Sequence, residues 1–120
     1  MASVSAQREP RHPLDAMTAA PNHHSVLLEN DRVRVLDTRL GPGEQTPVHA
    51  HEWPGALYVL SWSDFIRYDA DDNAIVDSRA LGMNPAIGTT LWSAPLAPHY
   101  VRNVGTDVLH VIAVELKEVP

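Results

Sequence analysis

Two histidines, His49 and His51, lie two positions apart in the stretch Gly43 to His51, which reads Gly-Glu-Gln-Thr-Pro-Val-His-Ala-His. Side chains two positions apart on a β-strand point to the same side, so both imidazoles can reach one ion. A third histidine, His99, follows in the strand-like run Pro98 to Asn103. Neutral imidazole is the commonest protein ligand for transition metals. The pattern therefore predicts a metal site formed by His49, His51 and His99.

Short strands separated by turn residues are expected to hold these histidines in place. Apolar and β-branched runs predict strands over 25–29, 32–40, 56–60, 64–68, 74–79, 89–93, 99–103 and 108–116, besides the histidine strand. Asn30-Asp31 predicts a tight turn, and Gly105-Thr106-Asp107 predicts a hairpin turn between the last two strands. The single helical pattern is a short one over 14–20. The fold class expected from this pattern is all-β, a sandwich or barrel.

The first 22 residues differ from the rest in composition. They are rich in Ala, Ser and Pro, and Pro10, Pro13 and Pro21 interrupt any helix. We therefore expect a flexible N-terminal arm over 1–22 and a single domain over 23–118. Because the first fifteen residues carry Arg8, Glu9 and Arg11 and have no apolar run, no secretory signal is expected and the expected location is cytoplasmic.

Composition excludes several classes of function. The chain has 120 residues and a net charge of −6, which argues against nucleic acid as a partner. No apolar run is long enough to span a membrane, and no basic helix would bind a membrane surface. Cysteine is absent, so disulfides and thiolate ligands are excluded and any metal ligands must be nitrogen or oxygen.

Sequence fragments around the histidines resemble a known family. Gly43-x5-His49-x-His51 resembles the start of the first cupin motif, His99-x3-Asn103 resembles the end of the second, and Tyr58-Val59-Leu60 resembles a segment common in the first. The chain, over about 24–116, thus resembles a small single-domain cupin of the RmlC-like kind. This resemblance implies a double-stranded β-helix, also called a jelly-roll barrel.

The sequence departs from the family's pattern at two places. Alignment on Tyr58 puts Gly55 where the family has a metal-binding Glu and Trp62 where it has a second Gly. The second motif has Pro95-Leu96-Ala97-Pro98 in place of its Pro-x-Gly segment. What the resemblance then implies is a three-histidine site, similar to that of the cysteine dioxygenases and the β-diketone-cleaving dioxygenase, which use ferrous iron. The expected cofactor is a divalent metal ion, with Fe²⁺ favoured for function and Zn²⁺, Ni²⁺ or Mn²⁺ as alternatives.

Aromatic residues near the two motifs predict an apolar pocket for a small organic molecule. The expected pocket residues are Trp53, Gly55, Trp92 and Tyr100. Tyr100 and Glu52 are also the only candidates for a general acid or base close to the metal.

Other polar residues near the motifs are given simpler interpretations. Strand alternation turns Glu52 away from the two histidines, so it is expected to face solvent. His23 and His24 are interpreted as an exposed turn, with a strap across the barrel mouth as the alternative. His110 is interpreted as a strand residue without a role in the site.

Two functions are consistent with these sequence features. The favoured one is a metal-dependent, dioxygenase-like enzyme acting on a small organic molecule. The alternative is a non-catalytic cupin that binds a small ligand or is stabilised by its metal. A jelly roll of this size leaves sheet edges to cover, and small cupins that the sequence resembles commonly pair, so a homodimer is expected.

Overall fold

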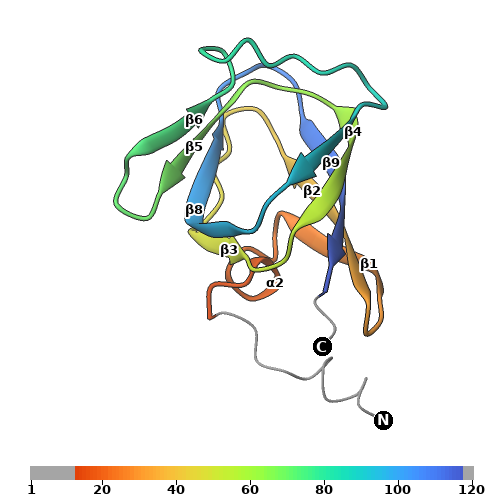
Figure 1. Cartoon of the computed structure of the whole chain (residues 1–120). Coiled ribbons are helices and arrows are strands. Elements are labelled where there is room, and N and C mark those ends of the chain that lie inside the picture. The colour runs from red at the N-terminus through yellow and green to blue at the C-terminus, as the bar shows by residue number, and fades with distance from the viewer. Residues whose placement is uncertain (1–12, 118–120) are drawn as a thin grey trace.

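Two antiparallel sheets enclose one interior in this computed structural model, which describes residues 13–117 (Figure 1). The larger sheet has the strand order β1-β2-β9-β4-β7, and the smaller sheet has the order β3-β8-β5-β6. The elements are α2 (Ala16–Ala19), β1 (His24–Glu29), β2 (Val33–Leu40), β3 (His49–His51), β4 (Gly55–Ser61), β5 (Phe65–Asp69), β6 (Ala74–Asp77), β7 (Thr90–Ser93), β8 (Leu96–Asn103) and β9 (Leu109–Leu116). Each predicted strand is present, with ends shifted by a few residues. The all-β class and the jelly-roll architecture are confirmed.

Alternation along the strands separates the interior from the surface. On β2, Arg34, Leu36 and Leu40 are buried, whereas the residues between them are more exposed. Leu36 and Val59, from β2 and β4, are fully buried and lie at the centre of the apolar core. Burying such side chains stabilises the fold by roughly 1.5–3 kcal/mol each.

Turn chemistry fixes two hairpins, the first of which is predicted by Asn30-Asp31. Between β1 and β2, the Asn30 side chain accepts hydrogen bonds from the backbone N–H groups of Arg32 and Val33. Between β5 and β6, Asp72 adopts a φ of 69°, a left-handed conformation that Asp tolerates better than most residues. These local signals set the register of both strand pairs.

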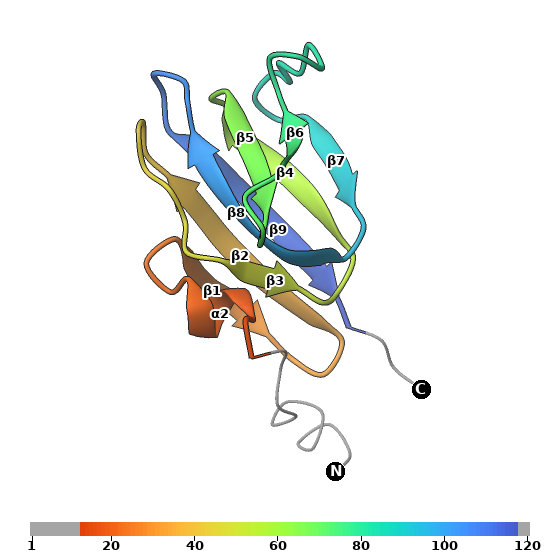
Figure 2. The same cartoon turned by 90° about the vertical axis from the view of Figure 1, so that its left-hand side faces the viewer.

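The predicted hairpin at Gly105-Thr106-Asp107 is wrong. β8 belongs to the smaller sheet and pairs with β3 and β5, whereas β9 lies between β2 and β4 in the larger sheet. The chain therefore crosses from one sheet to the other at this turn, as the side view shows (Figure 2). A turn sequence shows where a strand ends but not which strand it will pair with next, because pairing is decided by non-local packing.

Part of the predicted flexible arm is packed against the barrel. Asp15, Ala16 and Ala20 are buried, and the Leu14 carbonyl accepts a hydrogen bond of 2.6 Å from the backbone N–H of Ala50 in β3. The Asp15 side chain caps α2 by accepting a hydrogen bond from the Met17 N–H at 3.1 Å. Residues 14–20 are therefore packed against the barrel, although the prediction assigned them to the flexible arm over 1–22. The arm over 1–12 lies outside the described residues and stays a prediction.

None of the helices within residues 13–117 is long and apolar enough to span a membrane.

Candidate metal centre

Four histidines gather at one end of the interior. His49 and His51 come from β3, His99 from β8 and His24 from the first position of β1. His49 lies directly opposite His99 in the β3–β8 pair. The ring centroids of these two residues are 4.5 Å apart, and those of His51 and His99 are 5.8 Å apart. The three predicted histidines thus lie in one cluster, although the group with nitrogen atoms at metal-binding distances among residues 13–117 consists of His24, His49 and His51 and does not include His99.

His24 is a fourth member that the sequence interpretation placed wrongly in an exposed turn. Its side chain is buried, and its ring centroid lies 4.9 Å from that of His49 and 5.3 Å from that of His51. The nitrogen atoms that His24, His49 and His51 could offer to a metal lie within 4.8 Å of one another. A local feature of the sequence could have identified His24 as an interior residue. Extending the predicted strand 25–29 by one residue puts His24 on a strand, where its side chain can face the interior.

Each ring is oriented through its Nδ1 atom. The acceptors are the carbonyl oxygens of Ala20 for His24 (2.9 Å), Pro47 for His49 (2.9 Å) and Ala97 for His99 (2.7 Å), and a carboxylate oxygen of Glu115 for His51 (2.8 Å). These oxygens can only accept, so the hydrogen must be on Nδ1 in all four rings. In the neutral ring, this tautomer leaves the Nε2 lone pair for a metal.

Burial favours the neutral form of three of these rings. Loss of solvation lowers the pKa of His49 to about 3 and the pKa values of His24 and His99 to about 4. The neighbouring histidines lower these pKa values further, because each positive charge would repel the next. At neutral pH these imidazoles are therefore uncharged, which is the form that binds metal ions.

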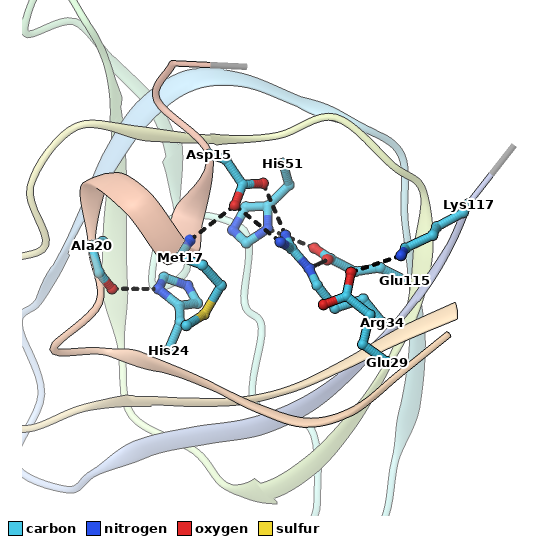
Figure 3. Close-up of polar contacts among 9 residues, drawn as sticks. All are labelled: Asp15, Met17, Ala20, His24, Glu29, Arg34, His51, Glu115 and Lys117. Atoms are coloured by element: carbon cyan, nitrogen blue, oxygen red, sulfur yellow. Dashed lines mark hydrogen bonds and ion pairs between the residues drawn. The ribbon is translucent and has the colours of Figure 1, made fainter. Parts of the chain in front are cut away.

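A series of buried ion pairs begins at the Nδ1 atom of His51 (Figure 3). Glu115 accepts from His51 through one oxygen and from Arg34 Nε through the other, at 2.8 Å each. Arg34 also donates two hydrogen bonds to Asp15, of 2.9 and 3.0 Å. The side chains of Arg34, Asp15 and Glu115 are at most 4% exposed. Sequence analysis found none of these three residues.

The charges of these ion pairs are fixed by mutual contact. Burial by itself raises the pKa of Glu115, but the hydrogen bond from His51 and the Arg34 charge together bring it below its ordinary value. Burial likewise opposes ionisation of Asp15, but the hydrogen bonds and the positive charge of Arg34, with the hydrogen bond from the Met17 N–H, together outweigh burial and lower the pKa. Asp15 and Glu115 carry two negative charges and Arg34 carries one positive charge, so this group of three residues has a net charge of one negative unit. That charge faces the histidine cluster through Glu115.

Position 55, where the cupin motif has a glutamate, has no room for a side chain. It lies opposite Glu115 in the β4–β9 pair, and a Cβ atom there would lie only 2.5 Å from the Val114 carbonyl oxygen. No larger side chain fits without moving a strand. The carboxylate next to the histidines comes from the residue opposite, Glu115, and it contacts His51 as a hydrogen-bond acceptor. Glu52 is exposed, as the sequence predicts.

A cavity of about 410 Å³ opens beside the histidine cluster. Trp53, Gly55 and Trp92 line it, in agreement with the predicted pocket, and Trp92 lies at its edge with 64% of its surface exposed. The cavity falls in the size range of small-molecule sites.

Tyr100 was predicted to line the pocket, and the structure places it elsewhere. As the neighbour of His99 on β8 it points to the opposite face, where it stacks on Tyr68 with ring centroids 4.8 Å apart. Its hydroxyl donates to Asp72 at 2.7 Å, and this bond raises the pKa of Tyr100 to about 12. It therefore does not serve as an acid or base in the cavity.

Comparison with known proteins supports the fold. A cupin domain from Bordetella pertussis Tohama I matches with a TM-score of 0.64 and 18% identity over 79% of this chain and 92% of that one. An RmlC-like cupin from Methanocaldococcus jannaschii gives a TM-score of 0.54 at 17% identity, covering 78% and 77%. The polyketide cyclase RemF from Streptomyces resistomycificus gives 0.51 at 20% identity, covering 81% and 66%.

No family model matches the sequence, and no curated protein matches it either. At these identities the solved structures establish the fold and leave the activity open. With two facing antiparallel sheets in jelly-roll order and these structural neighbours, the chain has the double-stranded β-helix fold of the RmlC-like cupins.

Proposed function

We propose that this protein binds a divalent transition-metal ion through the Nε2 atoms of His49, His51 and His99, with His24 as a fourth nitrogen beside them. The observation that carries the proposal is the common tautomer of the four rings, since every Nδ1 donates to an oxygen. Among residues 13–117 no hydrogen bond reaches the Nε2 atom of any of these rings, so the Nε2 atoms are available to a ligand. Oriented rings with second hydrogen bonds are typical of metal ligands.

The donor set fits a borderline ion such as Fe²⁺, Zn²⁺, Ni²⁺ or Mn²⁺. Such an ion, when bound, acts as a Lewis acid and a template for a small organic molecule. Residues around the ion would make further contributions. Glu115 holds the His51 ring, its negative charge offsets part of the charge of the ion, and the apolar walls of the cavity exclude water from the bound molecule.

The more specific proposal is an oxygenase-like enzyme that uses Fe²⁺ on a small organic molecule. It is supported by the all-nitrogen ligand set without a carboxylate and by the cavity of about 410 Å³ next to it. The alternative is a module that binds a small ligand without turnover. Fold does not distinguish the two, because one fold hosts many chemistries.

Metal analysis of the protein purified without an affinity tag tests the metal site. We expect close to one ion per chain in the wild type and much less in His51→Ala, with the circular dichroism spectrum unchanged. His110→Ala is the matched control, because His110 is a strand histidine whose Nε2 contacts Asp37 at 2.8 Å, outside the cluster. Equal metal content in wild type and His51→Ala would contradict the proposal. Oxygen uptake by the Fe²⁺-loaded protein with a panel of small organic acids then tests the enzymatic part.

A further inference from the structure

Arg67 holds a positive charge in the cavity wall, and no acidic side chain of residues 13–117 pairs with it. It lies on β5 on the same face as Phe65, and both residues line the cavity. Its Nε atom is buried and has no hydrogen-bond partner within residues 13–117. Burial lowers the pKa of this guanidinium, although an arginine side chain stays protonated in proteins. A buried donor without an acceptor destabilises a fold, so its presence calls for an explanation.

Three other arginines in the described chain are paired with carboxylates. Arg34 contacts Asp15 and Glu115, Arg39 contacts Asp37, and Arg79 contacts Asp64. Glu115 is the one acidic residue among the described residues lining the cavity, and both of its oxygens are already bonded, to His51 and Arg34. Asp69, the next residue but one along β5, accepts instead from the backbone N–H groups of Asp71 and Asn73.

Register places Arg67 near the histidine cluster. In the β5–β8 pair, Arg67 lies opposite Val101, which is two residues after His99 and therefore on the same face of β8. Diagonal neighbours of this kind have Cα atoms roughly 7–8 Å apart, and an arginine side chain spans that distance easily. One small molecule can therefore contact the histidine end and the guanidinium together.

The wall beside Arg67 is aromatic and carries a second unused donor. Trp62 packs edge-on against Phe65 with ring centroids 5.6 Å apart, and the Arg67 guanidinium lies 6.0 Å from the Phe65 ring centroid. The indole N–H of Trp62, which also lines the cavity, is buried without a partner among the described residues. A cation–π contact at 6.0 Å is at the limit of its useful range and does not satisfy an N–H donor.

We propose that Arg67 recognises the carboxylate of an organic anion that occupies the cavity with its apolar part against Trp62 and Phe65. A guanidinium fork matches a carboxylate through paired hydrogen bonds, which an uncharged ligand cannot form. The proposal deepens the proposed function, because it assigns a substrate class to the same cavity, and its arginine end can be tested without the metal.

Calorimetric titration with benzoate, and with benzamide as its uncharged analogue, tests this assignment in the metal-free and Zn²⁺-treated protein. We expect wild type to bind benzoate more tightly than benzamide. Arg67→Met should weaken benzoate binding about 10-fold or more and leave benzamide binding unchanged, because only the carboxylate loses its charge-assisted bonds. Arg67→Lys should give an intermediate affinity. Arg102→Met, an exposed arginine on the neighbouring strand β8, is the matched control and should bind like wild type.

The outcomes separate this proposal from the metal site. Benzoate binding that depends on Arg67 in a protein that takes up no Zn²⁺ would support the arginine assignment and contradict the proposed metal function. Zn²⁺ uptake together with benzoate binding that Arg67→Met leaves unchanged, or with no benzoate binding by wild type, would overturn the arginine assignment. If Arg67→Met fails to fold, the ratio of benzoate to benzamide affinity in Arg67→Lys decides, and a ratio equal to that of wild type overturns it.

Discussion

His51 Nδ1 donates a hydrogen bond of 2.8 Å to Glu115, a residue 64 positions later in the chain. This bond gives His51 a carboxylate partner, whereas the other three cluster histidines donate to backbone carbonyls. A carboxylate bonded to Nδ1 of a histidine fixes the tautomer and orients the ring. In the proposed metal site, His51 is therefore the ligand that depends most on a second side chain.

Replacing Glu115 with Gln should weaken metal binding without removing a ligand. Gln retains one acceptor oxygen but loses the negative charge, and its amide N–H₂ group would oppose a donor of Arg34. We expect the affinity for Zn²⁺ to fall about 10- to 100-fold, the usual range for losing such a partner. Competition with a coloured chelator measures it. Glu52→Gln, at the exposed carboxylate next to His51, is the control and should bind Zn²⁺ like wild type; equal affinities in all three proteins would refute the role of Glu115.

The metal-free protein should lose stability as the pH falls from about 7 to 5. The ordinary histidine pKa is 6.5, whereas burial lowers the pKa values of His24, His49 and His99 to about 4, 3 and 4. Between these values the unfolded chain binds protons that the folded chain does not bind. The stabilisation is therefore fully present above about pH 6.5 and decreases as the pH falls toward the folded-state values.

Urea denaturation of chelator-treated protein at several pH values measures this effect. Each such histidine lowers the free energy of unfolding by as much as about 1.4 kcal/mol per pH unit in this window. The window lies above the range in which carboxylates titrate, so the histidines dominate it. His49→Gln should show a shallower dependence than wild type, and a free energy of unfolding that stays constant from pH 7 to pH 5 would contradict the expectation.

A glutamate placed at position 55 should damage the fold instead of restoring the family's metal ligand. The Cβ of any side chain there would lie 2.5 Å from the Val114 carbonyl oxygen, so β4 and β9 would have to separate. We expect Gly55→Glu and Gly55→Ala each to destabilise the protein by about 1–3 kcal/mol, as overpacking does. Gly41→Ala is the control, since its nearest contact is the flexible end of Glu44 at 3.1 Å. Denaturation midpoints compare the three, and a Gly55→Ala protein as stable as Gly41→Ala would show that the strands adjust freely.

The homodimer expected from the sequence stays a prediction, and β1 is the strand to test. It forms one edge of the larger sheet, and Val26, Leu27 and Leu28 are 39%, 57% and 51% exposed there. An unpaired apolar edge favours pairing with a second copy, and a stable interface buries about 1,200 Å² or more in total.

Light scattering at micromolar concentration should give about twice the chain mass of 13.2 kDa for wild type and the single-chain mass for Leu28→Lys. Ile75→Lys is the matched control, because Ile75 is 54% exposed on β6, the edge strand of the other sheet. A wild-type mass near that of one chain would overturn the dimer.

Local patterns in the sequence determined much of this structure. Alternation and turn residues located the strands to within a few residues, because a strand's period of two and the special backbone angles of turns are local properties. The same alternation put His49 and His51 on one face, and motif spacing added His99. The strand predicted over 25–29 is one residue shorter than β1, which begins at His24, and so it leaves out the buried histidine.

Tertiary structure decided what stands around those histidines. Glu115, Arg34 and Asp15 are separated by 19 to 100 positions, and each looks like an ordinary polar residue in its own segment, yet the β2-β9-β4 register and the docking of α2 bring them together. Arg67 likewise resembles a surface arginine until the β5–β8 pairing turns it into the cavity. The turn sequence before β9 does not predict which of the two sheets this strand joins. Contacts between distant segments leave no periodic mark on a single sequence, since packing and strand pairing determine them only when the whole chain folds.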